Sequence, residues 1–370
     1  MSGLRILLTA DAVGGVWQYT TDLARALAVR HVETVIALLG PAPSVQQREQ
    51  VLAIPGAKLV ETGHSLDWLS DGPAPVLAAG AAVAELACDE HVDLLQLNMP
   101  SLGAAAPPPL PVVTVIHGCV PTWWQATCPG IALPGDFEWH SRLTGEGLRS
   151  SDAAVAPSVA YARAVADFYG LPSAPVAVHN GRTFPRSASS AMHDCVFTAG
   201  RLWDRAKNVA LLDRVAARLA VPFHAAGPII GPHGEAIALS HLHALGPLDA
   251  AGMVRQLACR PVFASAARFE PFGLAVLEAA MAGCALVLSD MPVFRELWTD
   301  AALFVAGEDE AAWAKAIETV IGDAELRADL GKAAQHRAAR YTADAMAAAM
   351  LRIYTRVTER HPPGEVPACE

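Results

Sequence analysis

The feature that most constrains the fold is an alternation of strand-like and helix-like segments that occurs twice along the chain. Short apolar runs alternate with segments whose apolar residues recur every three or four positions. The alternation covers residues 4–178 and starts again over residues 196–289. Strands that are apolar throughout and are separated by helices build a parallel sheet covered on both faces. The pattern therefore predicts an α/β protein made of two doubly wound halves.

The segment lengths also predict the individual elements. Strands are expected over residues 4–10, 33–39, 58–61, 93–98, 112–116, 153–157 and 175–178 in the first half, and over 196–199, 222–226, 261–265 and 285–289 in the second. Helices are expected over residues 16–29, 46–52, 76–88, 159–169, 208–219, 250–257 and 274–282, and again within 310–357, with breaks at 322–323 and 341–342. The Trp- and Pro-rich stretch after residue 118 shows no period and is expected to be irregular.

A segment without periodicity separates the two halves. Residues 183–193, TFPRSASSAMH, mix Pro, Ser and other small residues, a composition typical of linkers. The predicted organisation is thus a first domain over residues 1–182, a linker over 183–193 and a second domain over 194–340. A C-terminal helix over residues 341–360 is expected to pack back toward the N-terminal domain.

Charge and cysteine usage narrow the class of protein. The chain carries 27 Lys and Arg against 37 Asp and Glu, a net charge of −10, which argues against a basic surface for nucleic acid or an anionic membrane. The longest uncharged stretch, residues 94–135, is broken by prolines, so no transmembrane segment is expected. Seven scattered cysteines without a CxxC pair fit reduced thiols. A cytoplasmic protein is expected, with at most peripheral membrane association.

Two glutamates eight positions apart mark the segment FEPFGLAVLE, residues 269–278. If a helix begins just after Phe272, the amides of Gly273 and Leu274 are free to bind an anion. Glu270 then precedes the helix and Glu278 lies one to two turns inside it. The alternative for such a pair is a carboxylate at a helix start and another on a solvated helix face.

Two cations follow the predicted strand 196–199 in the segment GRLWDRAKN, residues 200–208. Lysine is scarce in this chain, with four among the 27 cations, so Lys207 inside a glycine-anchored turn stands out. Together with Arg201 it could stabilise negative charge on a departing phosphate without a metal ion. The alternative is a pair of solvated surface cations, which is the expectation for Arg205.

Two further segments carry chemistry that is weaker when each is taken alone. Gly14 and Gly15 precede the first predicted helix, where glycine lets the backbone approach a phosphate, although a tight turn also uses such a pair. His117 directly follows the strand 112–116, where a side chain can point away from the core. A structural histidine is the alternative at this position.

Together these four segments resemble the GT-B glycosyltransferases of the family 4 type, the group 1 glycosyl transferases, which are retaining enzymes that use nucleotide sugars. Smaller matches at residues 155–158, 179–181, 246–248 and 288–297 agree, so the resemblance extends over nearly the whole chain. It implies two facing Rossmann-like domains with a crevice between them, the first binding the acceptor and the second the donor. The implied activity is transfer of a hexose from a UDP- or GDP-sugar to a hydroxyl acceptor, with no metal ion or cofactor.

The resemblance also implies roles for single residues. Glu270 and His117 are expected at the donor hexose, where Glu270 senses charge that builds at the anomeric carbon. Glu278 is expected at the ribose hydroxyls, with Leu248 near the base. The donor diphosphate is assigned to Arg201, Lys207, Gly14, Gly15, Gly273 and Leu274.

The acceptor site is less defined, because the stretch that carries Trp123, Trp124 and Trp139 has no evident equivalent in the family. These side chains could stack on a sugar ring or an aromatic aglycone, or could simply be buried. The acceptor is therefore expected to be a saccharide or another molecule with a hydroxyl group.

No metal site is expected. The first domain contains no Asp-x-Asp, and its nearest look-alike is Asp136-Phe-Glu138. The His241-Leu-His243 pair has no third ligand at a fitting distance in the sequence. Two other functions stay open: a nucleotide-sugar epimerase or phosphorylase-like enzyme of the same fold, and a non-catalytic nucleotide- or carbohydrate-binding protein.

Overall fold

The structure is a computed structural model that describes residues 3–105, 110–185 and 191–361. Contacts between residues divide the chain into two units. The first unit runs to Arg182 and takes up the chain again at Ala343, and the second runs from Thr183 to Thr342. The residues predicted as a linker, 183–193, thus belong to the second unit, and residues 186–190 among them lie outside the described part of the chain.

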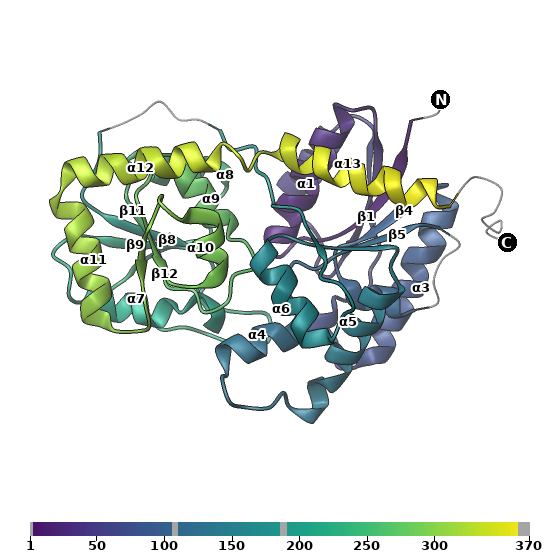
Figure 1. Cartoon of the computed structure of the whole chain (residues 1–370), viewed down its shortest axis with the longest axis horizontal. Coiled ribbons are helices and arrows are strands. Elements are labelled where there is room, and N and C mark those ends of the chain that lie inside the picture. Colours follow the sequence, from purple (N-terminus) through teal and green to yellow (C-terminus); the bar gives the residue numbers. More distant parts are fainter. Residues whose placement is uncertain (1–2, 106–109, 186–190, 362–370) are drawn as a thin grey trace. The chain divides into compact units, whose positions relative to one another are not determined.

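The first unit is built on a parallel sheet in which the strands follow the order β3-β2-β1-β4-β5-β6-β7 (Figure 1). Its strands are β1 (Arg5–Asp11), β2 (Glu33–Leu39), β3 (Ala57–Glu61), β4 (Leu94–Leu97), β5 (Val112–Val115), β6 (Ala153–Ala156) and β7 (Val176–Ala177). Side chains of β1 alternate between two faces: Ile6 and Leu8 lie in one core cluster and Leu7 in another, all fully buried. Both faces of the sheet are therefore covered, as the largely apolar strands predict.

The helices of this unit connect and cover the strands. They are α1 (Gly15–Ala28), α2 (Val45–Leu52), α3 (Pro73–Asp89), α4 (Val120–Thr127), α5 (Glu138–Ser150), α6 (Val159–Tyr169) and α13 (Ala343–Glu359), with short 3₁₀ turns at η1 (Asp67–Leu69), η2 (Pro100–Ala104) and η3 (Gly135–Phe137). All predicted strands of this half are present, and the doubly wound α/β class is confirmed.

Helices α4 and α5 lie in the stretch that was expected to be irregular, so that expectation is wrong. In α4, Pro121 lies in the first turn, where the missing N–H is not needed. The buried stripe of α5 contains His140, Thr144 and Gly147, which a search for apolar periodicity does not detect. Gly147 is required by close packing, because a Cβ there would lie 1.8 Å from the carbonyl oxygen of Pro100.

The last helix, α13, belongs to the first unit although the whole second unit precedes it in the sequence. It lies along α1, as Figure 1 shows. Met346, Met350 and Tyr354 are buried in the same core cluster as Trp17 and Leu23 of α1. The helix therefore completes the hydrophobic core on one face of the sheet.

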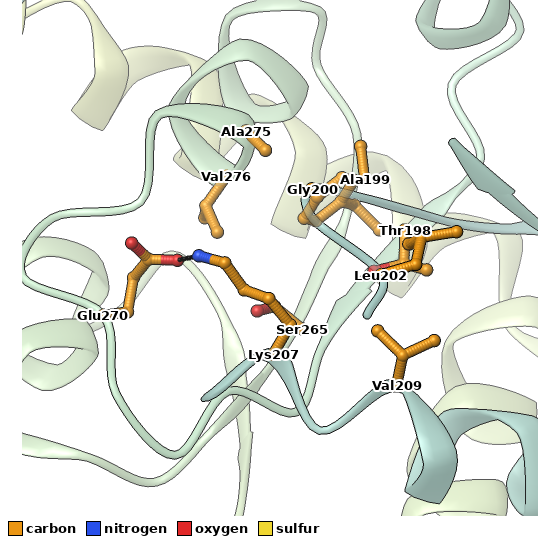
Figure 2. A pocket seen from close by; sticks show the side chains of 11 residues that line it. Thr198, Ala199, Gly200, Leu202, Lys207, Val209, Ser265, Glu270, Ala275 and Val276 are labelled. Carbon is orange, nitrogen blue, oxygen red and sulfur yellow. Dashed lines mark hydrogen bonds and ion pairs between the residues drawn. The ribbon is translucent and has the colours of Figure 1, made fainter. Parts of the chain in front are cut away.

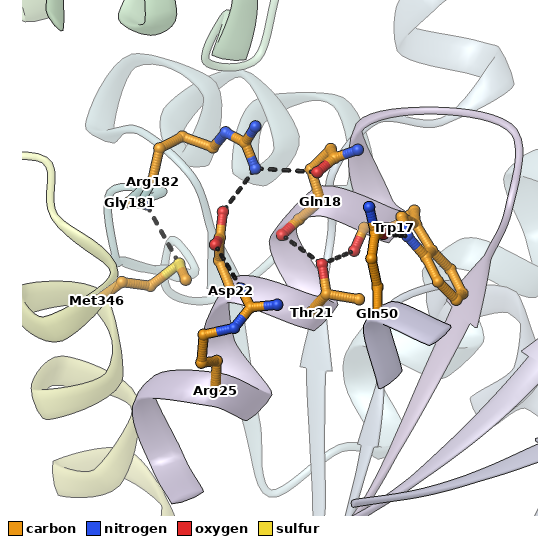
Figure 3. A network of polar contacts seen from close by, with 9 residues as sticks. All are labelled: Trp17, Gln18, Thr21, Asp22, Arg25, Gln50, Gly181, Arg182 and Met346. Carbon is orange, nitrogen blue, oxygen red and sulfur yellow. Dashed lines mark hydrogen bonds and ion pairs between the residues drawn. The ribbon is translucent and has the colours of Figure 1, made fainter. Parts of the chain in front are cut away.

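A buried ion pair holds the chain where it leaves the first unit (Figure 3). The Arg182 guanidinium donates to Asp22 Oδ2 at 2.6 Å and to Gln18 Oε1 at 3.0 Å, both on α1. The side chains of Arg182 and Asp22 are only 9% and 3% exposed. The neighbouring Gly181 N–H lies 3.2 Å from the sulfur of Met346, at the start of α13. The segment that leaves the first unit is thus fixed to α1 and also to the start of α13, where the chain returns to this unit.

The second unit contains a second parallel sheet, with the strand order β10-β9-β8-β11-β12-β13. Its strands are β8 (Val196–Ala199), β9 (Phe223–Ala226), β10 (His243–Gly246), β11 (Val262–Ser265), β12 (Leu286–Ser289) and β13 (Leu303–Val305). Its helices are η4 (Arg205–Lys207), α7 (Val209–Ala216), α8 (Ala250–Ala258), α9 (Leu274–Met281), α10 (Pro292–Trp298), α11 (Glu310–Gly322) and α12 (Ala324–Ala338). The edge strands β10 and β13 were not predicted; unlike the other strands of this sheet, they are mostly half-buried or exposed.

The cysteine prediction holds only in part. Among the described residues, the thiols of Cys119, Cys128, Cys195, Cys259 and Cys284 are free. Cys88 is not among these free thiols. Within the described ranges, the helices lack the combination of length and apolarity that crossing a bilayer requires.

Candidate functional site

A pocket lies at the carboxyl edge of the second sheet, between the ends of β8 and β11 and the start of α9 (Figure 2). In a parallel sheet this is the edge where loops present backbone N–H groups and polar side chains to a ligand. The pocket is lined by Thr198, Ala199, Gly200, Leu202, Lys207, Val209, Phe263, Ser265, Glu270, Ala275 and Val276. It thus combines a glycine-containing turn, one cation, one carboxylate and the first turn of a helix.

Lys207 and Glu270 form an ion pair across this pocket, as Figure 2 shows. Lys207 ends the short turn η4, and Glu270 lies in the loop before α9, so residues 63 positions apart meet. The two side chains are 21% and 15% exposed. An ammonium group has three N–H donors, so Lys207 can bind Glu270 and still donate to a ligand oxygen. The pair therefore offers a cation to a phosphate and a carboxylate to a hydroxyl group next to it.

Arg201 is anchored on one side and open on the other. Its guanidinium donates to Asp204 Oδ2 at 2.8 Å and lies 5.7 Å from the ring centre of Trp203. Asp204 is buried, and its other oxygen accepts a hydrogen bond from the Ala206 N–H at 2.9 Å. Arg201 remains 40% exposed, so several of its N–H donors are available to an anion. Asp204 is a positioning residue that the sequence reasoning missed, although its place three residues after Arg201 is a detectable signal.

The turn that carries Arg201 is held by close backbone packing. The Gly200 N–H donates to the Ala226 carbonyl at 3.0 Å, and the Leu202 N–H donates to the Pro228 carbonyl at 3.0 Å. Gly227 has a φ of +138°, and a Cβ there would lie 1.7 Å from the Gly200 oxygen. Glycine is therefore required at position 227 to bring the two loops together.

Helix α9 begins at the position that the sequence predicts. Gly273 is its N-cap with a φ of +94°, a left-handed conformation that favours glycine. The amides of Leu274, Ala275 and Val276 form the first turn and have no partner within the helix. Ala275 and Val276 also line the pocket, so this helix end can bind an anion there. Glu278 lies half-buried in the next turn.

Leu248 lies two residues beyond β10, outside the group of residues that line the pocket. Its loop is tied to the site through the backbone, since the Gly227 N–H donates to the Gly246 carbonyl at 2.9 Å. The structure thus brings together Lys207, Glu270 and the start of α9, and it places Arg201 on the adjoining turn.

In the first unit, the two glycines at the start of α1 differ in whether the backbone N–H already has a hydrogen-bond partner. Asp11, the last residue of β1, accepts hydrogen bonds from the amides of Val13 at 2.9 Å and Gly14 at 3.2 Å. The Gly14 N–H, which was expected to bind phosphate, is therefore already engaged. Gly15 is the first residue of the helix, and amides in a first turn have no intrahelical partner. Of the two glycines, Gly15 therefore has the backbone N–H that is better suited to bind a phosphate.

His117 lies two residues beyond β5, at the carboxyl edge of the first sheet. Its Nε2 lies 3.2 Å from Asn98 Oδ1, and its ring meets the edge of Tyr19 with centroids 4.3 Å apart. Burial lowers the pKa of His117 to about 3, so the imidazole is neutral at physiological pH. It can therefore exchange hydrogen bonds with hydroxyl groups without carrying charge.

This lowered pKa predicts a pH-dependent stability. The unfolded chain protonates His117 near its ordinary pKa of 6.5, whereas the folded chain stays neutral down to about pH 3. The free energy of unfolding should thus fall as the pH decreases from 6.5 toward 3. We expect the stability advantage of the wild type over His117→Gln, measured by urea unfolding, to shrink over this range. If the difference in the free energy of unfolding between the two proteins stayed constant with pH, the lowered pKa of His117 would be contradicted. His140, whose pKa burial lowers to about 4, is present in both proteins.

The three tryptophans proposed for acceptor binding differ in their surroundings. Trp123 and Trp124 lie on α4, half-exposed, with ring centroids 6.4 Å apart. Trp139 stacks on His140 at 3.6 Å and packs against a core cluster. All three tryptophans are half-buried, so their part in acceptor binding stays a prediction.

The described residues contain no group of three or more His, Cys, Asp or Glu side chains placed to hold a metal ion. His241 and His243, the pair weighed from the sequence, are both exposed. The ring of His243 instead meets the edge of His224, with centroids 5.5 Å apart on neighbouring strands.

Known proteins resemble this chain in both units. Residues 13–182 match the family described as Glycosyltransferase Family 4, and residues 241–337 match the family described as Glycosyl transferases group 1. A phosphatidyl-myo-inositol mannosyltransferase of Mycolicibacterium smegmatis is 26% identical, over 94% of this chain and 92% of its own length. A D-inositol 3-phosphate glycosyltransferase of Xylanimonas cellulosilytica is 34% identical, but over only 25% of this chain and 23% of its own length.

Solved structures of glycosyltransferases share the fold. A sucrose-phosphate synthase from Thermosynechococcus elongatus has a TM-score of 0.80 at 16% identity, covering 96% of this chain and all of its own. The Anabaena protein HepE in complex with UDP-glucose has a TM-score of 0.75 at 18% identity, covering 95% of this chain and all of its own. At these identities the likeness establishes the two-sheet architecture.

Proposed function

Because the chain belongs to the family 4 glycosyltransferases of the group 1 type, with a GT-B fold, we propose that it is a retaining, metal-independent hexosyltransferase. The proposed reaction moves a hexose from a UDP- or GDP-sugar to a hydroxyl acceptor. The observation that carries this proposal is the Lys207–Glu270 pair beside the first turn of α9, in the pocket of the second unit. A sugar diphosphate is a ligand that fits this pair. Its phosphate groups bind a cation, and the sugar hydroxyl groups next to them can donate hydrogen bonds to a carboxylate.

The roles follow from the charge that develops during transfer. The leaving nucleoside diphosphate gains negative charge as the glycosidic bond breaks, and Arg201, Lys207 and the amides of α9 would stabilise it. Glu270 would bind hexose hydroxyls and stabilise positive charge at the anomeric carbon. Glu278, one turn further along the helix, would bind the ribose.

The named relatives support a hexose as the transferred group. One is a mannosyltransferase, and another structure of the same fold was solved with UDP-glucose. The base and the hexose can be identified by thermal shift with UDP, GDP and ADP and with their sugars, because a bound ligand raises the melting temperature by mass action. Formation of a different sugar nucleotide from the donor alone would indicate an epimerase instead.

Retention of configuration is expected because residues 94–135, which include His117 and the start of α4, contain no Asp or Glu. An inverting enzyme needs a base opposite the leaving group. Without one there, a phosphate oxygen of the leaving group can accept the acceptor's proton on the same face. Proton NMR of the first-formed product from an α-linked donor should show an α-linkage. A β-linked product would refute the retaining mechanism.

Activity is also expected to survive EDTA. Cationic side chains at Arg201 and Lys207, together with helix amides, supply the charge that a divalent ion provides in other transferases. The measurement is the initial rate with and without excess EDTA, using the donor found by thermal shift. Complete loss of activity in EDTA that Mg²⁺ or Mn²⁺ restores would contradict this prediction. The matching control is the rate with added Mg²⁺ and no EDTA, which should be unchanged.

A further inference from the structure

The indole ring of Trp203 lies beside the Arg201 guanidinium in the second unit. Arg201 Cζ is 5.7 Å from the ring centre, within the roughly 6 Å over which an aromatic face attracts a cation. Trp203 is half-buried and lies outside the group of residues that line the pocket. Gly200 and Leu202, which flank Arg201, belong to that group. The ring is therefore placed to act on Arg201 rather than on a ligand.

The ion pair with Asp204 does not fix the plane of the Arg201 guanidinium. Arg201 donates to one Asp204 oxygen through a single N–H at 2.8 Å, and the other Asp204 oxygen accepts from the Ala206 N–H. A guanidinium has five N–H donors in one plane, and a group held by one hydrogen bond can turn about it. The Trp203 ring supplies a second point of contact, which limits this rotation. The remaining N–H donors of Arg201 are thus held in one orientation.

A turn in the loop after β9 holds the Trp203 ring in place. Gly231 in this turn is buried, and a Cβ there would lie 2.8 Å from two carbons of the ring. Two backbone hydrogen bonds close the turn: the Gly231 N–H donates to the Glu235 carbonyl at 2.7 Å, and the Gly234 N–H donates to the Gly231 carbonyl at 3.1 Å. The loop packs directly against the ring because position 231 carries no side chain. Through the ring, Arg201 is connected to a loop that follows a different strand.

We propose that Trp203 is a positioning residue that holds the Arg201 guanidinium in the orientation that binds the diphosphate of a nucleoside diphosphate. The identity of the anion rests on the proposed function, whereas the restraint on Arg201 does not. A side chain that is ordered before a ligand arrives loses less conformational freedom on binding. Trp203 thereby raises the affinity for the nucleotide through Arg201, without a contact of its own to the phosphates.

The restraint can be measured in the unliganded full-length protein. Arginine labelled with ¹³C and ¹⁵N reports the order of each guanidinium in NMR relaxation, and Arg201→Ala identifies the signals of Arg201. We expect an ordered Arg201 guanidinium in the wild type and in Trp203→Phe, which keeps an aromatic face. In Trp203→Leu, which keeps an apolar side chain without that face, the guanidinium should become mobile. An Arg201 guanidinium that is equally ordered in Trp203→Leu would overturn the proposal.

The effect on the ligand is measured by calorimetric titration with UDP or GDP, whichever stabilises the protein in thermal shift. We expect Trp203→Leu to raise the Kd about threefold to tenfold, and Trp203→Phe to bind close to the wild type, because it retains the attraction between ring and cation. In an Arg201→Ala background, adding Trp203→Leu should alter the Kd less than about twofold, since the side chain on which the ring acts is missing. An undiminished effect in that background would refute the route through Arg201.

Phe304→Leu is the matched control, since Phe304 contacts a cation in the same way and in the same unit. Arg295 Cζ lies 4.1 Å from its ring centre, and neither residue lines the pocket. This variant should bind UDP or GDP as the wild type does. A loss of affinity as large as that of Trp203→Leu would show that the effect is not specific to the turn of Arg201 and would count against the proposal.

Gly231→Ala is a second variant, which keeps Trp203 itself. Because a Cβ at position 231 would displace the ring, this variant should raise the Kd as Trp203→Leu does. A wild-type Kd would refute the role of the loop. Failure of the proposed function shows differently: UDP and GDP then do not bind, or bind equally well to Arg201→Ala, while the guanidinium of the unliganded protein is ordered by Trp203 as stated.

Discussion

Replacing Lys207 by alanine is expected to lower kcat/KM by about 30- to 1,000-fold, which corresponds to ~2–4 kcal/mol of lost transition-state stabilisation. Lys207 is the cation that shares the pocket with Glu270, and its removal also leaves that 15% exposed carboxylate without its partner. The negative charge of Glu270 would then lie beside the charge that develops on the diphosphate. Arg201→Ala should show a loss of the same order, because Arg201 lies on the turn next to the pocket and its guanidinium is fixed by Asp204. Steady-state kinetics with the identified donor provide the measurement.

Arg205→Ala is the matched control for this pair of variants. Arg205 lies in the same short turn as Lys207, but its side chain is exposed and, unlike Lys207, it does not line the pocket. We expect a near-normal kcat/KM for it. If Lys207→Ala and Arg201→Ala were also near normal, the diphosphate would have to bind elsewhere.

The second large effect is expected on stability rather than on rate. Replacing Asp22 by alanine should lower the free energy of unfolding by about 3–5 kcal/mol, because the buried Arg182 guanidinium then loses its ion pair with the Asp22 carboxylate. The desolvation of a guanidinium that is only 9% exposed is no longer offset by a carboxylate at 2.6 Å. Urea unfolding followed by tryptophan fluorescence, compared at the transition midpoints, measures the loss.

Arg25→Ala serves as the control, since Arg25 also contacts Asp22 but is 44% exposed at a distance of 3.4 Å. Exposed pairs contribute at most about 1 kcal/mol, so this variant should unfold close to the wild type. A loss of less than about 1 kcal/mol for Asp22→Ala would mean that the Arg182 pair behaves as a surface pair.

The fold class could be predicted from the sequence because buried parallel strands leave a direct signal. β1, β2 and β8 are largely apolar and buried, and their bounds agree with the prediction to within a few residues. α9 was placed correctly, because Gly273 marks a start that requires a left-handed backbone. α5 was missed since only two of its buried residues, Leu143 and Leu148, are large and apolar, and the others include His140 and Gly147.

Within the site, the sequence identifies which residue types are present but not which of them meet. Lys207 and Glu270 were proposed separately, for different parts of a ligand, and their pairing depends on β8 and β11 being neighbours in the sheet. The hydrogen bond from the Gly14 amide to Asp11 depends on the geometry of the turn between them. The presence of an Asp three residues before a glycine does not determine that geometry. The contact between Trp203 and Gly231 joins two loops that follow different strands, and no local pattern indicates it.

The position of α13 has a consequence for how the protein is made. A ribosome releases the chain from its N-terminus, so the strands and α1 of the first unit emerge early, while the helix that covers Trp17 and Leu23 emerges only after the second unit. The second unit, from Thr183 to Thr342, is continuous and has left the ribosome before α13. Domains generally fold as units during synthesis. We therefore expect the order of folding to be the reverse of the order of synthesis, with the second unit native first. Until α13 docks, the nascent chain exposes an apolar helix face of the kind that chaperones bind.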